Sequence, residues 1–164
     1  MLRVALPEGR AWQESVLDGP GFRLVTFLAG CPHNCPLCHN AWLCDYQAGE
    51  SISETELAAA LFDNYIPGWH EGVTISGGDP FVQGIELAVF LSQIKSRMPE
   101  LSVWVYTGFL YEQLVKADEP ALRFIDVLVD GPFISARANE NQTFRGSGNQ
   151  RIIFLVDGRA VAWE

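Results

Sequence analysis

Three cysteines in one short segment are the residues of this chain with the clearest chemical meaning. Cys31, Cys35 and Cys38 are separated by three and then by two residues. Thiolates with this spacing can bind one iron–sulfur cube and leave its fourth iron without a protein ligand. Ferredoxin-type electron carriers use other spacings and a fourth cysteine. The segment therefore predicts a 4Fe-4S cluster with one iron open to chemistry.

Two other uses of the cysteines stay open from the residues alone. A structural zinc site takes four thiolates, usually from two separated pairs. Cys44 would complete such a set, but inside a single segment of 14 residues. A plain iron–sulfur electron carrier is the other alternative. We expect Cys44 instead to be a small packing residue, because free cysteine is among the residue types most often buried.

A pair of glycines followed by an acid forms a second candidate site. Gly77, Gly78 and Asp79 follow a short apolar run, at the end of an expected strand. Glycines let a backbone approach a ligand closely, and carbonyl groups together with a carboxylate suit a ligand ammonium group. The same three residues also fit an ordinary turn. Their place one strand–helix unit after the cysteines favours the ligand role.

Alternating strand and helix patterns position both motifs. Residues 23–29 form an apolar, β-branched run that ends at a glycine, as a buried strand would, and the cysteines follow directly. Ser53 and Glu56 have the spacing of a capping box, which predicts the start of a helix. The other expected strands are residues 72–76, 101–106, part of 124–130, and 151–156, and the other expected helices are residues 87–98 and about 110–117.

These patterns predict one α/β domain over residues 1–164. Strands that alternate with helices favour a mainly parallel sheet covered by helices. A closed eight-stranded barrel needs about 200 residues or more. The 164 residues therefore fit an incomplete, open TIM-like barrel of mainly parallel strands. Such folds place their sites at the carboxyl ends of the strands, where the cysteines and the glycine pair both fall.

Charge and hydropathy exclude several classes of partner. Eleven basic and 20 acidic side chains give a formal net charge of −9, whose field repels a phosphate backbone, so we expect no nucleic-acid partner. No apolar stretch reaches the roughly 20 residues that span a bilayer, and no signal peptide is recognisable. We therefore expect a cytoplasmic protein without a membrane partner. In that reducing compartment, clustered cysteines indicate metal ligands rather than disulfides.

The cysteine segment resembles the signature loop of the radical S-adenosylmethionine (SAM) enzymes, in which three cysteines hold a 4Fe-4S cluster and SAM chelates the remaining iron. Other segments resemble a narrower group, the activating enzymes for glycyl radical enzymes, and among them the activators of anaerobic ribonucleoside-triphosphate reductase. One departure is Leu37, where many radical SAM proteins have an aromatic residue. The segments that carry the resemblance are residues 18–23, 31–40, 104–108, 127–133 and 144–151.

The resemblance implies a mechanism together with its cofactors and partners. The reduced 4Fe-4S cluster passes one electron to the sulfonium of SAM, which is cleaved to methionine and a 5'-deoxyadenosyl radical. This radical takes a hydrogen atom from one glycine of the partner, anaerobic ribonucleoside-triphosphate reductase. A low-potential electron donor supplies the electron. The protein's part is then to place the reactants rather than to transfer protons, so we expect no general base.

The resemblance also assigns SAM contacts to residues of this chain. It places the SAM amino group at Gly77, Gly78 and Asp79, where Asp79 stands in place of a glutamate. Thr107 and Asp130 lie at successive strand ends, where related activators hold polar groups near the SAM carboxylate. An aspartate at a strand end also fits a cap for the following turn.

Two further positions can be interpreted in more than one way from the sequence. The loop that begins at Arg145 combines a cation with backbone donors, so it fits contact with SAM or with the partner, or a plain surface loop. His39 follows the third cysteine and fits contact near the cluster or a local structural role. His33 and His70 carry no sequence signal and receive no role.

Two alternative functions stand beside the activase. One is a radical SAM enzyme with a small-molecule substrate, as in the compact 7-carboxy-7-deazaguanine synthases. The other is a non-catalytic iron–sulfur or zinc module. Iron and sulfide content and the response of the cluster's spectrum to SAM separate the non-catalytic module from the two enzymes.

Overall fold

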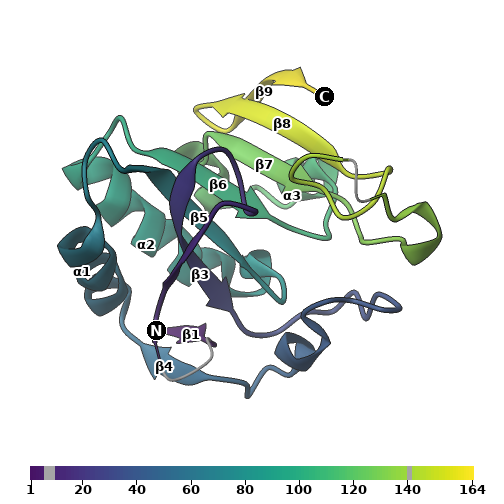
Figure 1. Ribbon diagram of the computed structural model, residues 1–164, viewed down its shortest axis with the longest axis horizontal. Coiled ribbons are helices and arrows are strands. Elements are labelled where there is room, and N and C mark those ends of the chain that lie inside the picture. The colour runs from purple at the N-terminus through teal and green to yellow at the C-terminus, as the bar shows by residue number, and fades with distance from the viewer. Residues whose placement is uncertain (6–9, 140–141) are drawn as a thin grey trace.

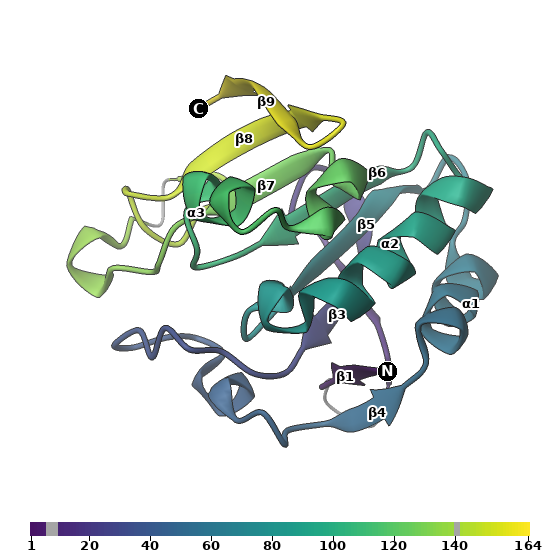
Figure 2. The ribbon, with the colours of Figure 1, turned by 180° about the vertical axis from the view of Figure 1, so that it is seen from behind.

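One mixed sheet carries the fold, and the α-helices lie on one of its faces (Figures 1 and 2). The computed structural model describes residues 1–5, 10–139 and 142–164, and within them the sheet has nine strands. The strands are β1 (Leu2–Val4), β2 (Gln13–Ser15), β3 (Phe22–Leu28), β4 (Glu50–Ile52), β5 (His70–Gly77), β6 (Ser102–Tyr106), β7 (Val127–Asp130), β8 (Arg151–Val156) and β9 (Arg159–Trp163). The α-helices are α1 (Glu54–Asn64), α2 (Gly84–Arg97) and α3 (Tyr111–Lys116), and short 3-10 helices lie at η2 (Ala41–Cys44), η3 (Pro80–Gln83), η4 (Pro120–Phe124) and η5 (Ser135–Arg137).

The sheet is parallel at its centre and antiparallel on both sides. Its order is β4-β1-β3-β5-β6-β7-β8-β9, with β2 paired to β3 outside that path. The strands β3, β5, β6 and β7 run parallel, whereas β1, β2, β4, β8 and β9 pair antiparallel with their neighbours. The expected mainly parallel sheet is therefore found only in the four central strands. The sheet does not close, because β4 and β9 lie at its opposite edges.

The expected helices are confirmed with their end signals. The Ser53 hydroxyl accepts a hydrogen bond from the Glu56 amide at 3.2 Å, and the Glu56 carboxylate accepts one from the Ser53 amide at 3.1 Å. This capping box starts α1, as its spacing predicts. The helix α2 buries Leu87, Leu91 and Ile94 against the sheet and ends just before Met98 and Pro99.

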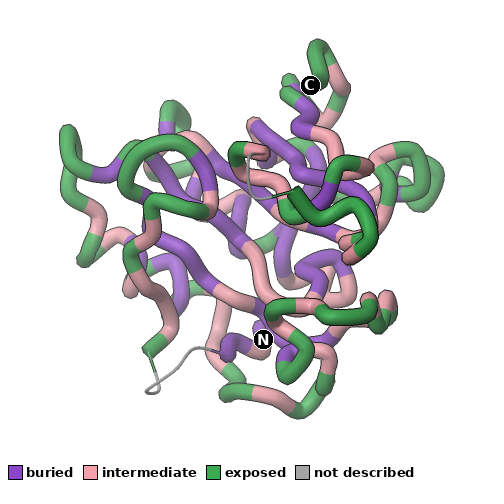
Figure 3. Tube along the Cα trace, turned by 45° about the vertical axis from the view of Figure 1, so that its right-hand side comes forward, coloured by how far each residue is buried: buried purple, intermediate pink, exposed green. Residues whose placement is uncertain are grey.

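Alternation along the strands divides the core between the two faces of the sheet. On the helix-covered face, Leu24, Ile75 and Val105 belong to one large cluster with the helices. On the other face, Trp104 and Val129 belong to a smaller cluster that also contacts the loop before β8. Successive residues of a strand point to opposite faces, which accounts for the two clusters. Figure 3 shows the buried segments concentrated along the strands and the exposed ones in the loops.

The same alternation sorts the strand-end residues that the sequence indicates. Thr107 comes directly after β6, and Asp130 is the last residue of β7. Because side chains alternate along a strand, both lie on the same side of the sheet as the helix-covered face. Tyr106 belongs to the cluster on the other face, called here the open face. In the described part of the chain, no helix is long and apolar enough to cross a bilayer.

Candidate cluster and cofactor site

The three cysteines lie on a loop that leaves the carboxyl end of β3 and is closed at its base by the main chain. The Gly30 amide donates to the Leu43 carbonyl at 2.8 Å, and the Cys31 amide donates to the Cys44 carbonyl at 3.4 Å. The buried Leu43 side chain fixes the returning end of the loop. Figure 1 shows this cysteine loop, residues 30–44, projecting from the sheet.

Two left-handed residues curl the loop around its cysteines. Asn34 has φ 47° and Leu37 has φ 60°, and they directly precede Cys35 and Cys38. The Cys38 amide donates to the Cys35 carbonyl at 3.2 Å, which closes a turn between these two cysteines. Among the described residues, no three acidic, histidine or cysteine side chains are yet grouped as a metal site. The donor set, three half-buried thiols on one curled loop, nevertheless fits an iron–sulfur cluster.

Burial disfavours the thiolate form of two of these cysteines. Loss of solvent raises the pKa of Cys31 to about 11 and also raises the pKa of Cys35. Iron binding requires thiolates and releases the protons. Cys44 is half-buried rather than fully buried, and its carbonyl accepts from the Cys31 amide. The structure therefore places Cys44 beside the base of the loop.

The glycine pair at the end of β5 packs directly on the base of the cysteine loop. A Cβ atom on Gly78 would lie 2.4 Å from the Gly30 carbonyl oxygen and 2.6 Å from that of Leu43. Gly77 has φ 123°, and a Cβ atom there would lie 2.2 Å from the Leu28 carbonyl oxygen. Only glycine allows the two backbones to approach this closely. The segment thus joins the second motif to the first.

Asp79 is fully buried, and its carboxylate is held by four neighbouring residues. Its oxygens accept from the Phe81 amide at 3.1 Å and the Gly108 amide at 2.9 Å. The Thr107 hydroxyl lies 3.0 Å from both oxygens, and His33 Nε2 lies 2.8 Å from Oδ2. The structure therefore brings Asp79 and Thr107 together, as their strand-end positions predict. It also adds His33, which the sequence did not indicate.

Asp130 is held in a different network, on the helix-covered side. Its carboxylate accepts from Arg151 Nε at 2.9 Å and Nη2 at 2.5 Å, and from the Tyr111 amide, at the first residue of α3, at 2.7 Å. Arg151 also pairs with Glu112, and the two carboxylates raise the pKa of the guanidinium above its usual range. The structure thus gives Asp130 the capping contact that its strand-end position suggests.

A hollow of about 530 Å³ on the open face contains Arg145. Among the described residues, five buried side-chain polar atoms have no hydrogen-bond partner, and three of them belong to residues of this hollow. They are Tyr106 Oη, Gln142 Oε1 and Arg145 Nε. Burial also raises the pKa of the Tyr106 hydroxyl, which stays a hydrogen-bond donor. Unpaired buried polar groups are costly, so this cluster indicates a place for a polar ligand.

The hollow joins the cysteine loop to the amino-terminal turn. Its lining includes His39, directly after Cys38, and Asp18, in the glycine-rich turn before β3. The Asp18 carbonyl accepts from the Thr74 hydroxyl at 2.7 Å, and the Thr74 hydroxyl in turn accepts from Arg23 Nε at 2.8 Å. The buried Arg23 therefore holds this turn against the open face.

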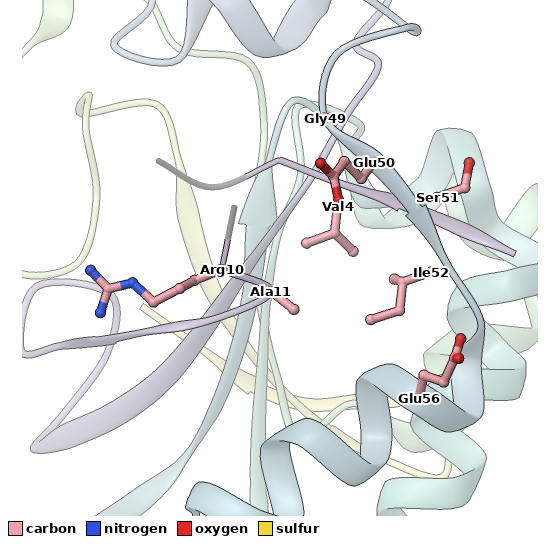
Figure 4. A pocket seen from close by; sticks show the side chains of 8 residues that line it. All are labelled: Val4, Arg10, Ala11, Gly49, Glu50, Ser51, Ile52 and Glu56. Carbon is pink, nitrogen blue, oxygen red and sulfur yellow. The ribbon is translucent and has the colours of Figure 1, made fainter. Parts of the chain in front are cut away.

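A second hollow, of about 590 Å³, lies beside β1 and β4 (Figure 4). Its lining combines apolar Val4 and Ile52 with the charged side chains of Arg10, Glu50 and Glu56. None of the cysteines and none of the strand-end residues line it. We therefore place the candidate site at the cysteine loop and the open face.

Sequence reasoning missed three residues of this site, namely His33, Tyr106 and Gln142. Tyr106 had a usable signal, because it ends a strand that the sequence predicts, two residues after the buried Trp104. His33 had none, since its partner Asp79 is distant in the chain, and Gln142 belongs to no recognisable motif. His70, also without a signal, forms a structural contact with Glu14 at 2.8 Å.

Comparison with known proteins shows the family to which the chain belongs. The model of the 4Fe-4S single cluster domain matches residues 17–153, which supports an iron–sulfur cluster in this chain. The anaerobic ribonucleoside-triphosphate reductase-activating protein of Haemophilus influenzae is 35% identical over 142 residues, covering 84% of this chain and 90% of that protein. Those of Enterobacteria phage T4 and Escherichia coli K12 are 33% and 31% identical, covering 87% and 85% of this chain and 90% and 93% of theirs. The chain belongs to this family of reductase-activating proteins.

Proposed function

We propose that this chain is a radical SAM enzyme that generates a glycyl radical on anaerobic ribonucleoside-triphosphate reductase. The observation that carries the proposal is the position of the cysteine loop. It leaves the carboxyl end of a central parallel strand, beside a hollow with three buried polar side-chain atoms that have no partner among the described residues, in a chain of the reductase-activating family. The fold is accordingly an incomplete radical SAM barrel in a single domain.

The three thiolates of Cys31, Cys35 and Cys38 hold the 4Fe-4S cluster in this proposal. When bound, the reduced cluster and SAM supply a one-electron cleavage whose radical removes a hydrogen atom from a glycine of the reductase. The left-handed turns at Asn34 and Leu37 shape the loop around the cluster. A low-potential donor delivers the electron, and the exposure of Leu37, 81%, leaves the loop accessible to it.

The strand-end turn after β5 receives the amino group of SAM. Gly77 and Gly78 bring the backbone of this turn against the base of the cysteine loop. Asp79 is fully buried behind this turn, where it adds a negative charge, and the hydrogen bonds that it accepts from Thr107 fix the turn. Asp130 contributes to SAM binding only indirectly. It fixes the start of α3 and thereby the neighbouring strand-end loop.

The hollow on the open face receives the segment of the reductase that carries the glycine. Gln142 offers an acceptor and Arg145 a donor, and Tyr106 offers both. Peptide groups present one donor and one acceptor each, which matches this set. His39 lines the same hollow and lies next to Cys38, so a segment bound there would lie beside the cluster. Binding of the reductase would also exclude water from the radical.

Anaerobic reconstitution with a cognate reductase tests the proposal. We expect about four irons and four sulfides per chain. With SAM and a reductant, a glycyl radical should appear on the reductase by electron paramagnetic resonance. The 5'-deoxyadenosine formed should match the spin count and should rise when the reductase is added. Equally fast SAM cleavage with and without the reductase, with no radical on it, would instead support a small-molecule substrate.

A further inference from the structure

His33 connects the cysteine loop to the strand ends through Asp79. The other three residues that hold Asp79 come from the turn after β5 and the turn after β6: Phe81, Thr107 and Gly108. Only His33 comes from the cysteine loop, with 2.8 Å between Nε2 and Oδ2. One buried carboxylate thereby joins three segments that are distant in the sequence. His33 lies two residues from both Cys31 and Cys35.

The His33 ring has little freedom at this position. A Cβ atom on Gly108 would lie 2.4 Å from its Cδ2 atom, so the absence of a side chain at Gly108 makes room for the ring. Phe109 packs against it edge-on, with ring centroids 4.5 Å apart and an interplanar angle of 71°. The side chain of His33 is 17% exposed. The ring therefore occupies a defined slot between the cysteine loop and the β6–α3 turn.

We propose that His33 is a positioning residue that fixes the cysteine loop against the SAM-binding turn. With its proton on Nε2, the neutral imidazole donates to Asp79, so the contact requires no charged histidine. The proposal rests on the proposed function in two respects, namely that Cys31 and Cys35 hold the cluster and that the turn after β5 receives SAM. The hydrogen bond would then set where the cluster lies relative to the residues that receive SAM.

Removal of His33 should loosen the loop without unfolding the sheet. Asp79 would keep its hydrogen bonds from Phe81, Thr107 and Gly108, so the buried carboxylate would remain satisfied. The base of the loop would remain closed by Gly30 and Leu43. What is lost is the contact that orients the segment between the first two cysteines.

The test compares His33→Ala, His33→Gln and the exposed neighbour Pro32→Ala in the reconstituted full chain. SAM affinity is measured by the change that SAM causes in the absorption spectrum of the oxidised cluster, which does not cleave SAM. We expect roughly five- to tenfold weaker SAM binding and an altered spectrum in His33→Ala, from the lost hydrogen bond to a carboxylate. Glutamine supplies an amide donor, so His33→Gln should recover most of the affinity. Pro32→Ala should resemble the unmodified chain.

Hydrogen exchange of the iron-free chain separates this proposal from the proposed function. His33→Ala should raise the exchange rate within residues 31–40 and leave the central strands unchanged. In a double-mutant cycle, the effects of His33→Ala and Asp79→Asn on SAM affinity should not be additive. Unchanged exchange and SAM affinity in His33→Ala, or additive effects in the cycle, would overturn the positioning role. Iron content unaffected by Cys31→Ala would instead overturn the assignment of the cluster ligands.

Discussion

The Arg151 guanidinium donates hydrogen bonds to both carboxylate oxygens of the fully buried Asp130. The two residues are paired across the neighbouring strands β7 and β8. The same carboxylate accepts from the Tyr111 amide at the start of α3. This ion pair therefore links β7, in the parallel centre of the sheet, to β8, in its antiparallel part. Through the Tyr111 amide, the same carboxylate also fixes the start of α3. Such a pair is weak evidence of net stability, but removing one partner leaves a buried charge.

Arg151→Met should therefore be more damaging than a change that neutralises both partners. We expect a loss of about 3–5 kcal/mol in the free energy of unfolding, because Asp130 would stay charged and buried without its partner. The double variant Arg151→Met with Asp130→Asn should recover much of that loss. Urea denaturation of the three proteins measures it. A double variant no more stable than Arg151→Met would contradict the ion-pair explanation.

Alanine substitutions should distinguish the three cluster ligands from Cys44, which we expect not to bind the cluster. Cys31→Ala, Cys35→Ala or Cys38→Ala should each abolish stable cluster binding, since two thiolates do not close the anchoring set. Cys44→Ala should retain about four irons per chain and should still cleave SAM. Iron and sulfide analysis after anaerobic reconstitution gives the answer. Loss of the cluster from Cys44→Ala, together with its survival in Cys35→Ala, would reverse the ligand assignment.

Gly78→Ala should disrupt the contact between the glycine pair and the cysteine loop. The new methyl group would lie 2.4 Å from a backbone oxygen, which the surrounding main chain cannot avoid without moving. We expect a loss of stability of roughly 1–3 kcal/mol, as for other overpacked sites, together with weaker SAM binding. Gly148→Ala is the matched control, because its Cβ atom would meet nothing nearer than 3.5 Å. Equal melting temperatures for the two variants would refute the steric argument.

Tyr106→Phe should lower activity without lowering stability. The hydroxyl is buried and unpaired, so its removal should leave stability unchanged or raise it by up to about 1 kcal/mol. The glycyl radical yield on the reductase should nevertheless fall, if the hydroxyl binds the incoming segment. Thermal unfolding and spin counting on the same preparation compare the two properties. A full radical yield in Tyr106→Phe would remove this residue from the proposed docking site.

Arg145→Ala tests the other side of the same hollow. We expect the variant to assemble its cluster and bind SAM normally, and to lose coupling between SAM cleavage and radical formation. The reason is the Nε atom of Arg145, which is buried and has no hydrogen-bond partner among the described residues. The measurement is the ratio of 5'-deoxyadenosine to spins in the presence of the reductase. A ratio equal to that of the unmodified chain would assign Arg145 to the surface loop alone.

The sequence predicted the elements that carry strong local signals. The strand over residues 23–29, the Ser53 capping box and the helix before Pro99 all occur, with boundaries shifted by only a few residues. The strands β1, β2 and β4 were missed, since three residues are too few to show alternation. The strand β9 was also missed, and its pairing makes β8 half of a hairpin rather than the end of the sheet.

The candidate site was predictable only where chemistry and spacing coincide. The cysteines needed no structure to be noticed, and Asp79 followed from the glycines before it. The contacts of Asp79 did not follow, because His33 is 46 residues away and nothing in its local sequence identifies a partner. Arg151 and Asp130 are likewise joined by the pairing of two strands across 21 residues. Such pairs depend on strand register, which local patterns do not specify.

The closure of the cysteine loop at its base also bears on how the loop can change over evolutionary time. The two hydrogen bonds that close it, from Gly30 to Leu43 and from Cys31 to Cys44, join main-chain atoms, and residue type matters at these ends, where Gly30 has φ 90° and Leu43 is buried. Residues between these anchors can therefore be replaced, or their number altered, while the sheet keeps its register. Within the loop, a change of spacing would have to keep the contact of His33 with Asp79, because this contact ties the loop to the strand ends.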